Sequence, residues 1–422
     1  MTILKIVFKF SFIFFIVSAN GAFGEPLSWT DCVNQARKKH PELTSAREKI
    51  YQARSDRSIV RSGILPSLEG TIEASRSKDL NRVETRSYPM NLNARQLVFD
   101  GFTKLNQMKS TDKLINAAVY QYYVVSSDIR LRLRTAFVDL LKAEEFSRIA
   151  DIIYKRRKQN LELVKLRYEA GREHKGSLLV AEANLAQAEY EIKKAKRDIE
   201  LAKHKLSREL GNRFYTEINI TGSLEQPEEG AKIPDFESIA LKNPFLQNII
   251  AQKESARNNV DAAKGNFLPQ IYLFGSLGKD ESEFFSDREK WTGGIEATVP
   301  IFKGGENVAQ YRKSKAILRQ YEADSLNGFE SVLYTLRQTW KVLMDTIDTI
   351  SVQQKFLNAS EERAKIAQAQ YATGLISFDD WIIIEDDLVR DRKAYLDSLA
   401  NALIAQANWN QAKGETLGEI DK

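Results

Sequence analysis

The chain has 422 residues, of which 43% are hydrophobic and 28% are charged, a balance that is typical of folded proteins and argues against a disordered chain. The formal net charge of +5 is spread along the sequence, which argues against a nucleic-acid-binding protein. The single cysteine, Cys32, cannot form a disulfide within the chain, and the three histidines, His40, His174 and His204, lack the spacing of metal ligands.

The first 24 residues, 1–24, have the features of a secretory signal peptide. A lysine-bearing start is followed by an apolar run at residues 10–17, and the small residues Ala22 and Gly24 predict cleavage before Glu25. The alternative is an uncleaved membrane anchor, but the apolar run is shorter than the about 20 residues that a membrane-spanning helix needs.

The rest of the chain contains no sign of another membrane anchor. Cys32 lies in the sequence WTDC, which lacks the small residues of a lipoprotein signal, so no lipid anchor is expected there. No later stretch approaches about 18 consecutive apolar residues, so we expect no helix of the mature chain to cross a membrane.

The sequence contains two copies of one unit, because marker residues recur at a constant offset of 203 positions. The markers pair Pro41 with Pro244, Pro66 with Pro269, Gly171 with Gly374, Glu182 with Glu385, and Gly211 with Gly414. This offset predicts a first repeat over 25–211 and a second over 236–414, joined by a linker over 212–235 and followed by a tail over 415–422. A short strand is expected within the linker, near 217–220.

The first repeat is expected to begin with a helix over 28–62, which cannot continue through Pro66. Apolar and polar residues then alternate with a period of two over 67–76 and again over 89–99. This pattern predicts two strands separated by a polar loop over 76–88. The second repeat has the same alternation, and its strands are expected at 268–277 and 292–302.

Each pair of strands is followed by a long helical tract, 103–211 in the first repeat and 305–414 in the second. Apolar residues recur there every three or four positions, and no proline interrupts either tract. Gly171 and Gly374 predict a turn within each tract, which makes it a helical hairpin. A helix over 103–169 is about 100 Å long at 1.5 Å per residue, and its return partner is about half as long. We therefore expect the helix that opens each repeat to stack end to end with the returning helix.

Four strands of about ten residues have the length that crosses an outer membrane when they are tilted. In lipid a four-stranded sheet leaves two edges of unpaired N–H and C=O groups, and the smallest closed barrels have about eight strands. The sequence therefore predicts that copies of the chain pool their strands, and that a trimer makes a barrel of twelve. The polar strand faces would line its lumen, including Glu69, Glu73, Arg95 and Glu296. The alternative is a soluble sheet with one solvated face.

Short motifs occur in a fixed order: LPSLEG, QLVFDG and YEAG in the first repeat, and LPQI, VPIFKGG and YATGLISFDDWI in the second. In this order the chain resembles the TolC-like outer-membrane efflux proteins over about residues 27–414. The resemblance implies a mainly α fold with membrane β-strands. It implies a homotrimer in which the tandem-duplicated long helical hairpins form an α-barrel across the periplasm. Above this α-barrel, the strands would form a 12-stranded transmembrane β-barrel in the outer membrane. It also implies a periplasmic adaptor (a membrane fusion protein) and an inner-membrane pump as partners.

The resemblance places both hairpin turns at a periplasmic tip on which the adaptor docks. The docking residues that it implies are Tyr168, Gly171, Tyr371, Gly374, Leu375 and Ser377. The simpler alternatives are that the glycines only close the long helices and that Ser377 only caps the returning helix. The basic run over 155–158 is expected to be a solvated helix face.

The resemblance also implies a periplasmic gate at Asp380. Three copies of this residue around a threefold axis would form a carboxylate ring that repels anions and holds cations. The position three residues later, where the family has a second acidic residue, is Ile383, so an apolar constriction is expected there. The alternative for Asp380 is the favourable interaction of an acidic residue with the start of a helix.

We therefore expect a subunit of an outer-membrane channel that gives cargo a passive exit, as part of a tripartite efflux or type I secretion system. The sequence has no Ser/His/Asp set, phosphate-binding loop or carboxylate pair in a pocket motif, so neither enzyme activity nor a cofactor is expected. The main alternative is a periplasmic coiled-coil adaptor or scaffold without a membrane barrel. Drugs, metals and proteins all remain open as cargo.

Overall fold

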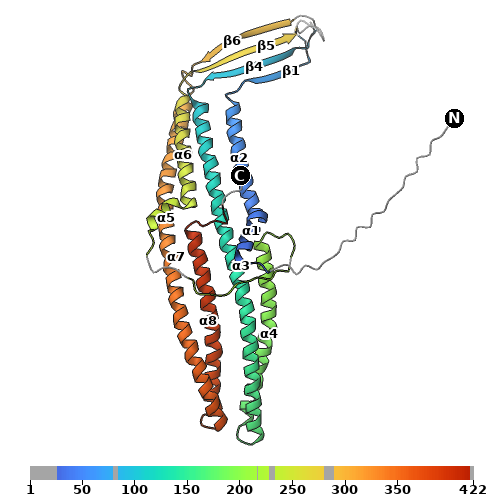
Figure 1. Cartoon of the computed structure of the whole chain (residues 1–422). Coiled ribbons are helices and arrows are strands. Elements are labelled where there is room, and N and C mark those ends of the chain that lie inside the picture. The colour runs from blue at the N-terminus through green and yellow to red at the C-terminus, as the bar shows by residue number, and fades with distance from the viewer. Residues whose placement is uncertain (1–25, 79–83, 216, 228–232, 280–288, 419–422) are drawn as a thin grey trace, which may run out of the picture.

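The computed structural model describes residues 26–418 except for 79–83, 216, 228–232 and 280–288. The predicted signal peptide, residues 1–24, and its cleavage site lie outside the described residues. The molecule is elongated and mainly helical, with a β-sheet at one end and the turns of two helical hairpins at the other (Figure 1). Short helices lie between these ends, at mid-height.

The helix that opens each repeat is broken in two, which corrects the single helix predicted over 28–62. The pieces are α1 (Trp29–Lys39) and α2 (Pro41–Ser62) in the first repeat, and α5 (Phe236–Lys242) and α6 (Pro244–Gly265) in the second. Pro41 has no N–H to donate and forces the preceding residue into an extended conformation. His40 (φ −67°, ψ 124°) therefore ends α1, and its side chain caps α2. Asn243 does the same before Pro244.

Each break lies where the returning helix of the hairpin ends. The returning helices are α4 (Lys175–Glu209) and α8 (Phe378–Ala412). Gly211 and Gly414 follow them and have positive φ values of 80° and 84°. A Cβ atom on Gly211 would lie 2.8 Å from the backbone of Lys39 and His40, and one on Gly414 would lie 2.4 Å from the ring of Pro244. The short helices thus stack end to end, and the close approach occurs once in each repeat.

The long helices run the whole length of the helical part. They are α3 (Thr103–Glu169) and α7 (Glu306–Thr373), with 67 and 68 residues, which makes each about 100 Å long. Contacts between neighbours give the order α2–α3–α6–α7 in the half nearer the sheet and α4–α3–α8–α7 in the other half (Figure 1). Among the described helices, none is both long enough and apolar enough to cross a membrane.

The main sheet is antiparallel and has the strand order β1–β4–β5–β6. Its strands are β1 (Ser67–Ile72), β4 (Met90–Phe99), β5 (Gln270–Lys279) and β6 (Glu289–Thr298). Their ends lie within about four residues of the predicted ones, a normal uncertainty for strand ends. The two repeats meet between β4 and β5, so β1 and β6 are edge strands with no further partner in the described part of the chain.

The polar loop predicted over 76–88 is in part a second hairpin, which corrects the prediction. Its strands are β2 (Ser75–Lys78) and β3 (Glu84–Ser87), and residues 79–83 between them lie outside the described residues. An ion pair between Arg76 Nε and Glu84 Oε1, at 2.6 Å, joins the two strands. All the described side chains of this hairpin are polar, so it lacks the apolar alternation that reveals a strand.

One face of the main sheet is apolar although it is exposed. Its large side chains, which are 47–79% exposed, are Leu68, Ile72, Leu92, Leu273, Leu277, Trp291 and Ile295. The strand register places Glu69, Arg95 and Glu296 together on the opposite face. An apolar patch of this extent on one side of a sheet is typical of a surface that meets lipid or another protein.

Two apolar cores lie at mid-height, one in each repeat. The first packs α1 and α2 against α3 and α4, and the second packs α5 against α7 and α8 around Trp340 and Trp409, whose ring centroids are 5.2 Å apart. The strand predicted near 217–220 is an isolated bridge between Leu27 and Ile220. In the tail, Leu417 is 4% exposed in the first core, whereas 419–422 lie outside the described residues.

The substitution Gly211→Ala tests the stacking contact. Alanine at positive φ costs about 1 kcal/mol, and its methyl group would also meet the backbone of Lys39 and His40. We expect the thermal unfolding midpoint, measured by circular dichroism, to fall several degrees further than in Gly171→Ala. Gly171 has a similar φ of 69° but no heavy atom within 4 Å of its Cβ position. Equal midpoints would show that the stacked ends do not contribute to stability.

Candidate functional site

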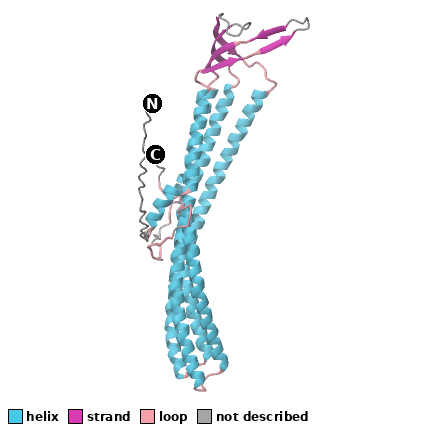
Figure 2. Ribbon diagram, turned by 90° about the vertical axis from the view of Figure 1, so that its right-hand side faces the viewer, coloured by secondary structure: helices cyan, strands magenta, loops and turns pink. Residues whose placement is uncertain are grey.

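The two hairpin turns lie against each other at the end of the molecule farthest from the sheet (Figure 2). Gly171 follows α3 with φ 69°, and Gly374 follows α7 with φ 83°. After Gly374, the N–H of Leu375 donates to the carbonyl oxygen of Gln370 at 2.8 Å, which closes the last turn of α7. Glycine is favoured at both positions because a Cβ atom is strained at positive φ.

An aromatic cluster joins the two hairpins just inside these turns. The ring of Tyr371 stacks on that of Trp381 with centroids 4.2 Å apart and planes 13° apart, and Phe378 meets both rings edge-on. Val164 of α3 and Ala181 of α4 pack against this cluster from the first hairpin. Tyr371 is 0% exposed, which corrects its predicted role as a docking residue: its side chain is part of the core.

Polar groups of Tyr371 connect the second hairpin to the first. Its hydroxyl donates to Glu173 Oε2 at 2.9 Å, and Arg167 Nη1 donates to its carbonyl oxygen at 2.5 Å. Burial of the Glu173 carboxyl group opposes its ionisation, but hydrogen bonds from Ser177 and Tyr371 outweigh burial and lower its pKa. Burial and the hydrogen bond to Glu173 raise the pKa of the Tyr371 hydroxyl. The tips are thus joined by a carboxylate and a neutral phenol.

The other predicted tip residues lie at the surface. Leu375 is 74% exposed and Tyr168 is 38% exposed, and both glycines of the turns are exposed. Ser377 is exposed as well, and its hydroxyl accepts a hydrogen bond from the N–H of Asp380 at 3.1 Å and donates to its carboxylate at 2.6 Å. Ser377 therefore caps α8, as the simpler alternative for this residue predicted.

The predicted gate residues lie about one turn apart near the start of α8. Asp380 is exposed and Ile383 is 58% exposed. Their spacing of three residues places them on the same side of the helix. Both side chains are thus available to a surface beyond this protomer.

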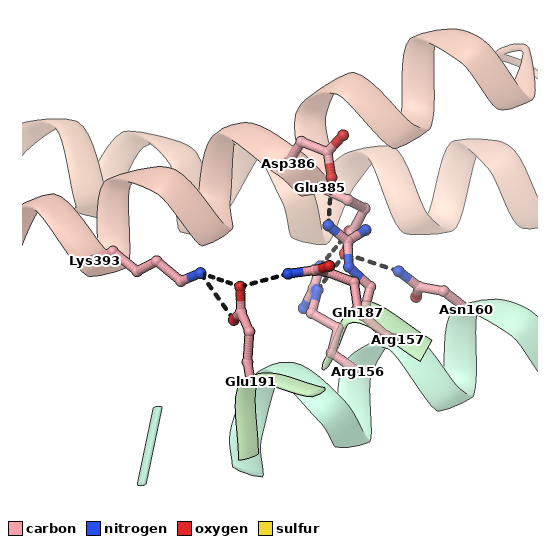
Figure 3. Close-up of polar contacts among 8 residues, drawn as sticks. All are labelled: Arg156, Arg157, Asn160, Gln187, Glu191, Glu385, Asp386 and Lys393. Carbon is pink, nitrogen blue, oxygen red and sulfur yellow. Dashed lines mark hydrogen bonds and ion pairs between the residues drawn. The ribbon is translucent and has the colours of Figure 1, made fainter. Parts of the chain in front are cut away.

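A buried polar network joins the two hairpins between the tips and mid-height (Figure 3). Glu385 of α8 is 1% exposed and accepts two hydrogen bonds from Arg156 of α3, at 2.5 and 2.6 Å. The side-chain amide of Asn160 donates to the same carboxylate at 3.0 Å. The hydrogen bonds to Glu385 raise the pKa of the Arg156 guanidinium. A two-pronged contact of this kind fixes the position of α8 against α3.

Further ion pairs extend this contact along the line where α3 and α4 meet α8, which we call the charged seam (Figure 3). Arg157 of α3 donates to Asp386 of α8, and Lys393 of α8 donates to both carboxylate oxygens of Glu191 in α4, at 2.8 and 2.9 Å. The α3–α8 contact is apolar at mid-height, where Val138 packs against α8, and again at the tips, where Val164 packs against the aromatic cluster. The two hairpins are therefore held by apolar packing at mid-height and at the tips, and by charged groups between these two levels.

This network corrects the prediction that the basic run over 155–158 is a solvated helix face. Lys155 and Lys158 are exposed, but Arg156 is half-buried and Arg157 is buried against α8. Sequence reasoning used Glu385 only as a marker of the duplication and did not assign it a contact. The available signal was the position of Glu385 four residues after Trp381 and three before Leu388, which places it on the apolar face of α8, since buried carboxylates are normally paired.

Three of the four residues predicted to line a lumen lie on one face of the main sheet. Arg95 stacks over the ring of Tyr272 at 4.1 Å, and its Nη2 lies 3.5 Å from Glu296 Oε2. Glu69 is on the same face in β1. Glu73 lies beyond the end of β1, where its N–H donates to the carbonyl oxygen of Pro89 at 3.1 Å.

Comparison with known proteins identifies relatives along both repeats. The family model described as outer membrane efflux protein matches residues 32–212 and 237–415. The probable outer membrane lipoprotein SilC of Salmonella typhimurium is 24% identical over 406 residues, which cover 90% of this chain and 84% of that protein. The alkaline protease secretion protein AprF of Pseudomonas aeruginosa is 25% identical over 341 residues, which cover 75% of this chain and 69% of that protein.

The fold is also found among solved structures. The open state of the MtrE outer membrane channel of Neisseria gonorrhoeae matches with a TM-score of 0.81 at 20% sequence identity. The match covers 92% of this chain and 88% of that chain. At this level of identity the likeness shows a common fold.

Reversing the charge of Arg156 tests whether the charged seam holds the two hairpins together. Arg156→Glu leaves the buried Glu385 without its partner, and removing one partner of a buried ion pair costs about 3–5 kcal/mol. We expect amide hydrogen exchange in residues 150–169 and 378–395, followed by mass spectrometry, to accelerate by about tenfold or more. The double variant Arg156→Glu/Glu385→Arg should recover part of the protection.

The matched control is Arg148→Glu. Arg148 is also on α3, but its side chain is 74% exposed and pairs with Glu145 of the same helix. Exposed pairs contribute little, so this variant should exchange like the original protein. If Arg156→Glu also exchanges like the original, the charged seam does not hold the hairpins together.

Proposed function

Because the chain belongs to the outer membrane efflux protein family, we propose that three copies of it close into one continuous duct through which cargo leaves the periplasm passively. The protein is an outer-membrane channel protein, and its family is a channel family rather than an enzyme family. This membership removes the support for the alternative of a periplasmic adaptor or scaffold.

The observation that carries the closure is that the protomer has the same two outer sides in the sheet and in both halves of the helical part. In the sheet, the outer elements are β1 and β6. Among the helices, they are α2 and α7 nearer the sheet, and α4 and α7 nearer the tips. A surface of one side that meets the opposite side of the next copy is a head-to-tail contact, and such contacts generate rings when the rotation closes.

The sheet supplies the energetic reason for a ring. The edges of β1 and β6 carry backbone N–H and C=O groups without partners in the described part of the chain. In lipid each unpaired group costs several kcal/mol, and pairing β6 of one copy with β1 of the next removes both edges. Three copies give twelve strands, with the apolar face of the sheet toward lipid and the face with Glu69, Arg95 and Glu296 toward the lumen.

The helical edges carry exposed apolar side chains that fit the same closure. On α7, Leu326 is 71% and Tyr334 is 67% exposed. On the opposite side of the protomer, Ile59 of α2 is 67% and Leu201 of α4 is 70% exposed. Contact between these edges would remove large apolar surfaces from water, which favours association by about 25 cal/mol per Å².

We propose that the tips form the periplasmic entrance of this duct. Asp380 would present a ring of three carboxylates and Ile383 an apolar ring about one turn above it. The exposed turn residues, Tyr168, Gly171, Gly374, Leu375 and Ser377, would contact a periplasmic adaptor that connects the duct to an inner-membrane pump. The support is their exposure at the end of the molecule opposite the sheet.

Purified protein in detergent tests the duct directly. We expect mass photometry to give three times the subunit mass, and the same preparation to produce discrete conductance steps in planar bilayers. Protein heated until its near-ultraviolet dichroism is lost serves as the control. A monomer that produces no conductance steps in the bilayer would contradict the proposal.

A second prediction concerns the entrance. Asp380→Asn removes three negative charges from the ring while keeping an acceptor for Ser377, so the preference for cations should fall. The reversal potential in a KCl gradient measures this change. Asp379→Asn is the matched control, because Asp379 is also exposed but points about 100° away around α8. A shift of equal size in both variants, or in neither, would remove Asp380 from the gate.

A further inference from the structure

We infer that the two hairpin tips are different docking sites, and that the first tip binds an acidic segment of its protein partner whereas the second binds an apolar one. This inference rests on the proposed docking role of the tips and adds the chemistry of the partner. It follows from how the two turns distribute their charges after folding.

The first tip presents a cationic surface because its central acid is turned inward. In the segment Arg172–Glu173–His174–Lys175, the Glu173 side chain is 9% exposed. Its two carboxylate oxygens accept hydrogen bonds from Ser177 at 2.9 Å and Tyr371 at 2.9 Å. Arg172 and Lys175 remain exposed beside it, and the imidazole of His174 is 72% exposed. One exposed acid, Glu169, lies nearby and offsets only part of this charge.

The second tip has the opposite character. Its turn exposes the apolar Leu375, and residues 370–380 contain no lysine or arginine. The first charged side chains after the turn are the exposed carboxylates Asp379 and Asp380. An acidic partner segment would be repelled there, whereas an apolar side chain would gain contact with Leu375.

The two tips therefore cannot recognise one identical partner surface equally well. Opposite charges steer association and select partners, and like charges across an interface are unfavourable. A protein partner fits this arrangement better than a phospholipid surface does. A flat anionic membrane would meet both tips at once, and Asp379 and Asp380 would oppose its approach.

The test uses helical hairpin peptides closed by a disulfide as probes. One probe carries two glutamates in its turn and the other carries two lysines. Binding of the full-length trimer to each immobilised probe is measured by biolayer interferometry at 50 and 500 mM salt, values at which screening differs strongly. We expect the glutamate probe to bind more tightly than the lysine probe, and high salt to weaken that binding.

Variants of the first tip locate the binding. Arg172→Gln/Lys175→Gln should weaken binding of the glutamate probe by roughly tenfold, and Arg172→Lys/Lys175→Arg should retain it. The matched control is Lys193→Gln/Lys196→Gln, which removes two exposed cations of α4, about 27–32 Å along the helix from Lys175. Equal binding of both probes, or equal loss in the tip and control variants, would overturn the inference.

Two further measurements separate the other outcomes. Flotation with phosphatidylglycerol vesicles that depends on Arg172 and Lys175, without binding of the glutamate probe, would overturn the inference in favour of a lipid surface. Conductance and subunit number are measured on the same preparations. A conducting trimer that binds neither probe contradicts only this inference. The absence of a trimer contradicts the proposed function, on which this inference rests.

Discussion

The backbone groups at the two edges of the four-stranded sheet, which have no partners in the described part of the chain, are the constraint on which the rest of the architecture depends. Such edges cannot remain open in lipid, and four strands cannot close on themselves. The helices are arranged in the same way. Helix α7 lies on the same side of the protomer as β6, and α2 and α4 lie on the same side as β1. One rotation between copies therefore closes the sheet and the helical part together, and this makes the proposed duct continuous.

The helical part differs along its length in what holds the hairpins together. At mid-height Val138 packs against Ala400 and Leu403, and separating these side chains would expose apolar surface. Towards the tips the contact passes through the Arg156–Glu385 pair, and then through the aromatic cluster and the Glu173–Tyr371 hydrogen bond. Separating the Arg156–Glu385 pair would leave a buried charge without its partner, which is costly as well. The hairpins are therefore joined along their whole contact, by apolar packing at mid-height and at the tips and by paired charges between these levels.

Much of the fold could be predicted because it follows from local patterns that are repeated. The periodicity of apolar residues and the positions of proline and glycine predict the duplication, the four main strands and the two long hairpins. The break at Pro41 was missed because proline is tolerated in the first turn of a helix, so the apolar pattern continues across it. The β2–β3 hairpin was missed because polar strands carry no apolar alternation.

The sequence by itself determined which residues form the turns and which strand faces are polar, since both depend on neighbours along the chain. Only the tertiary structure decided that Tyr371 is buried, that Glu173 turns inward, and that Arg156 meets Glu385. The last pair is separated by 229 positions, and the angle at which two helices meet selects such partners. Burial and pairing of charged side chains are properties of that packing, which no single segment encodes.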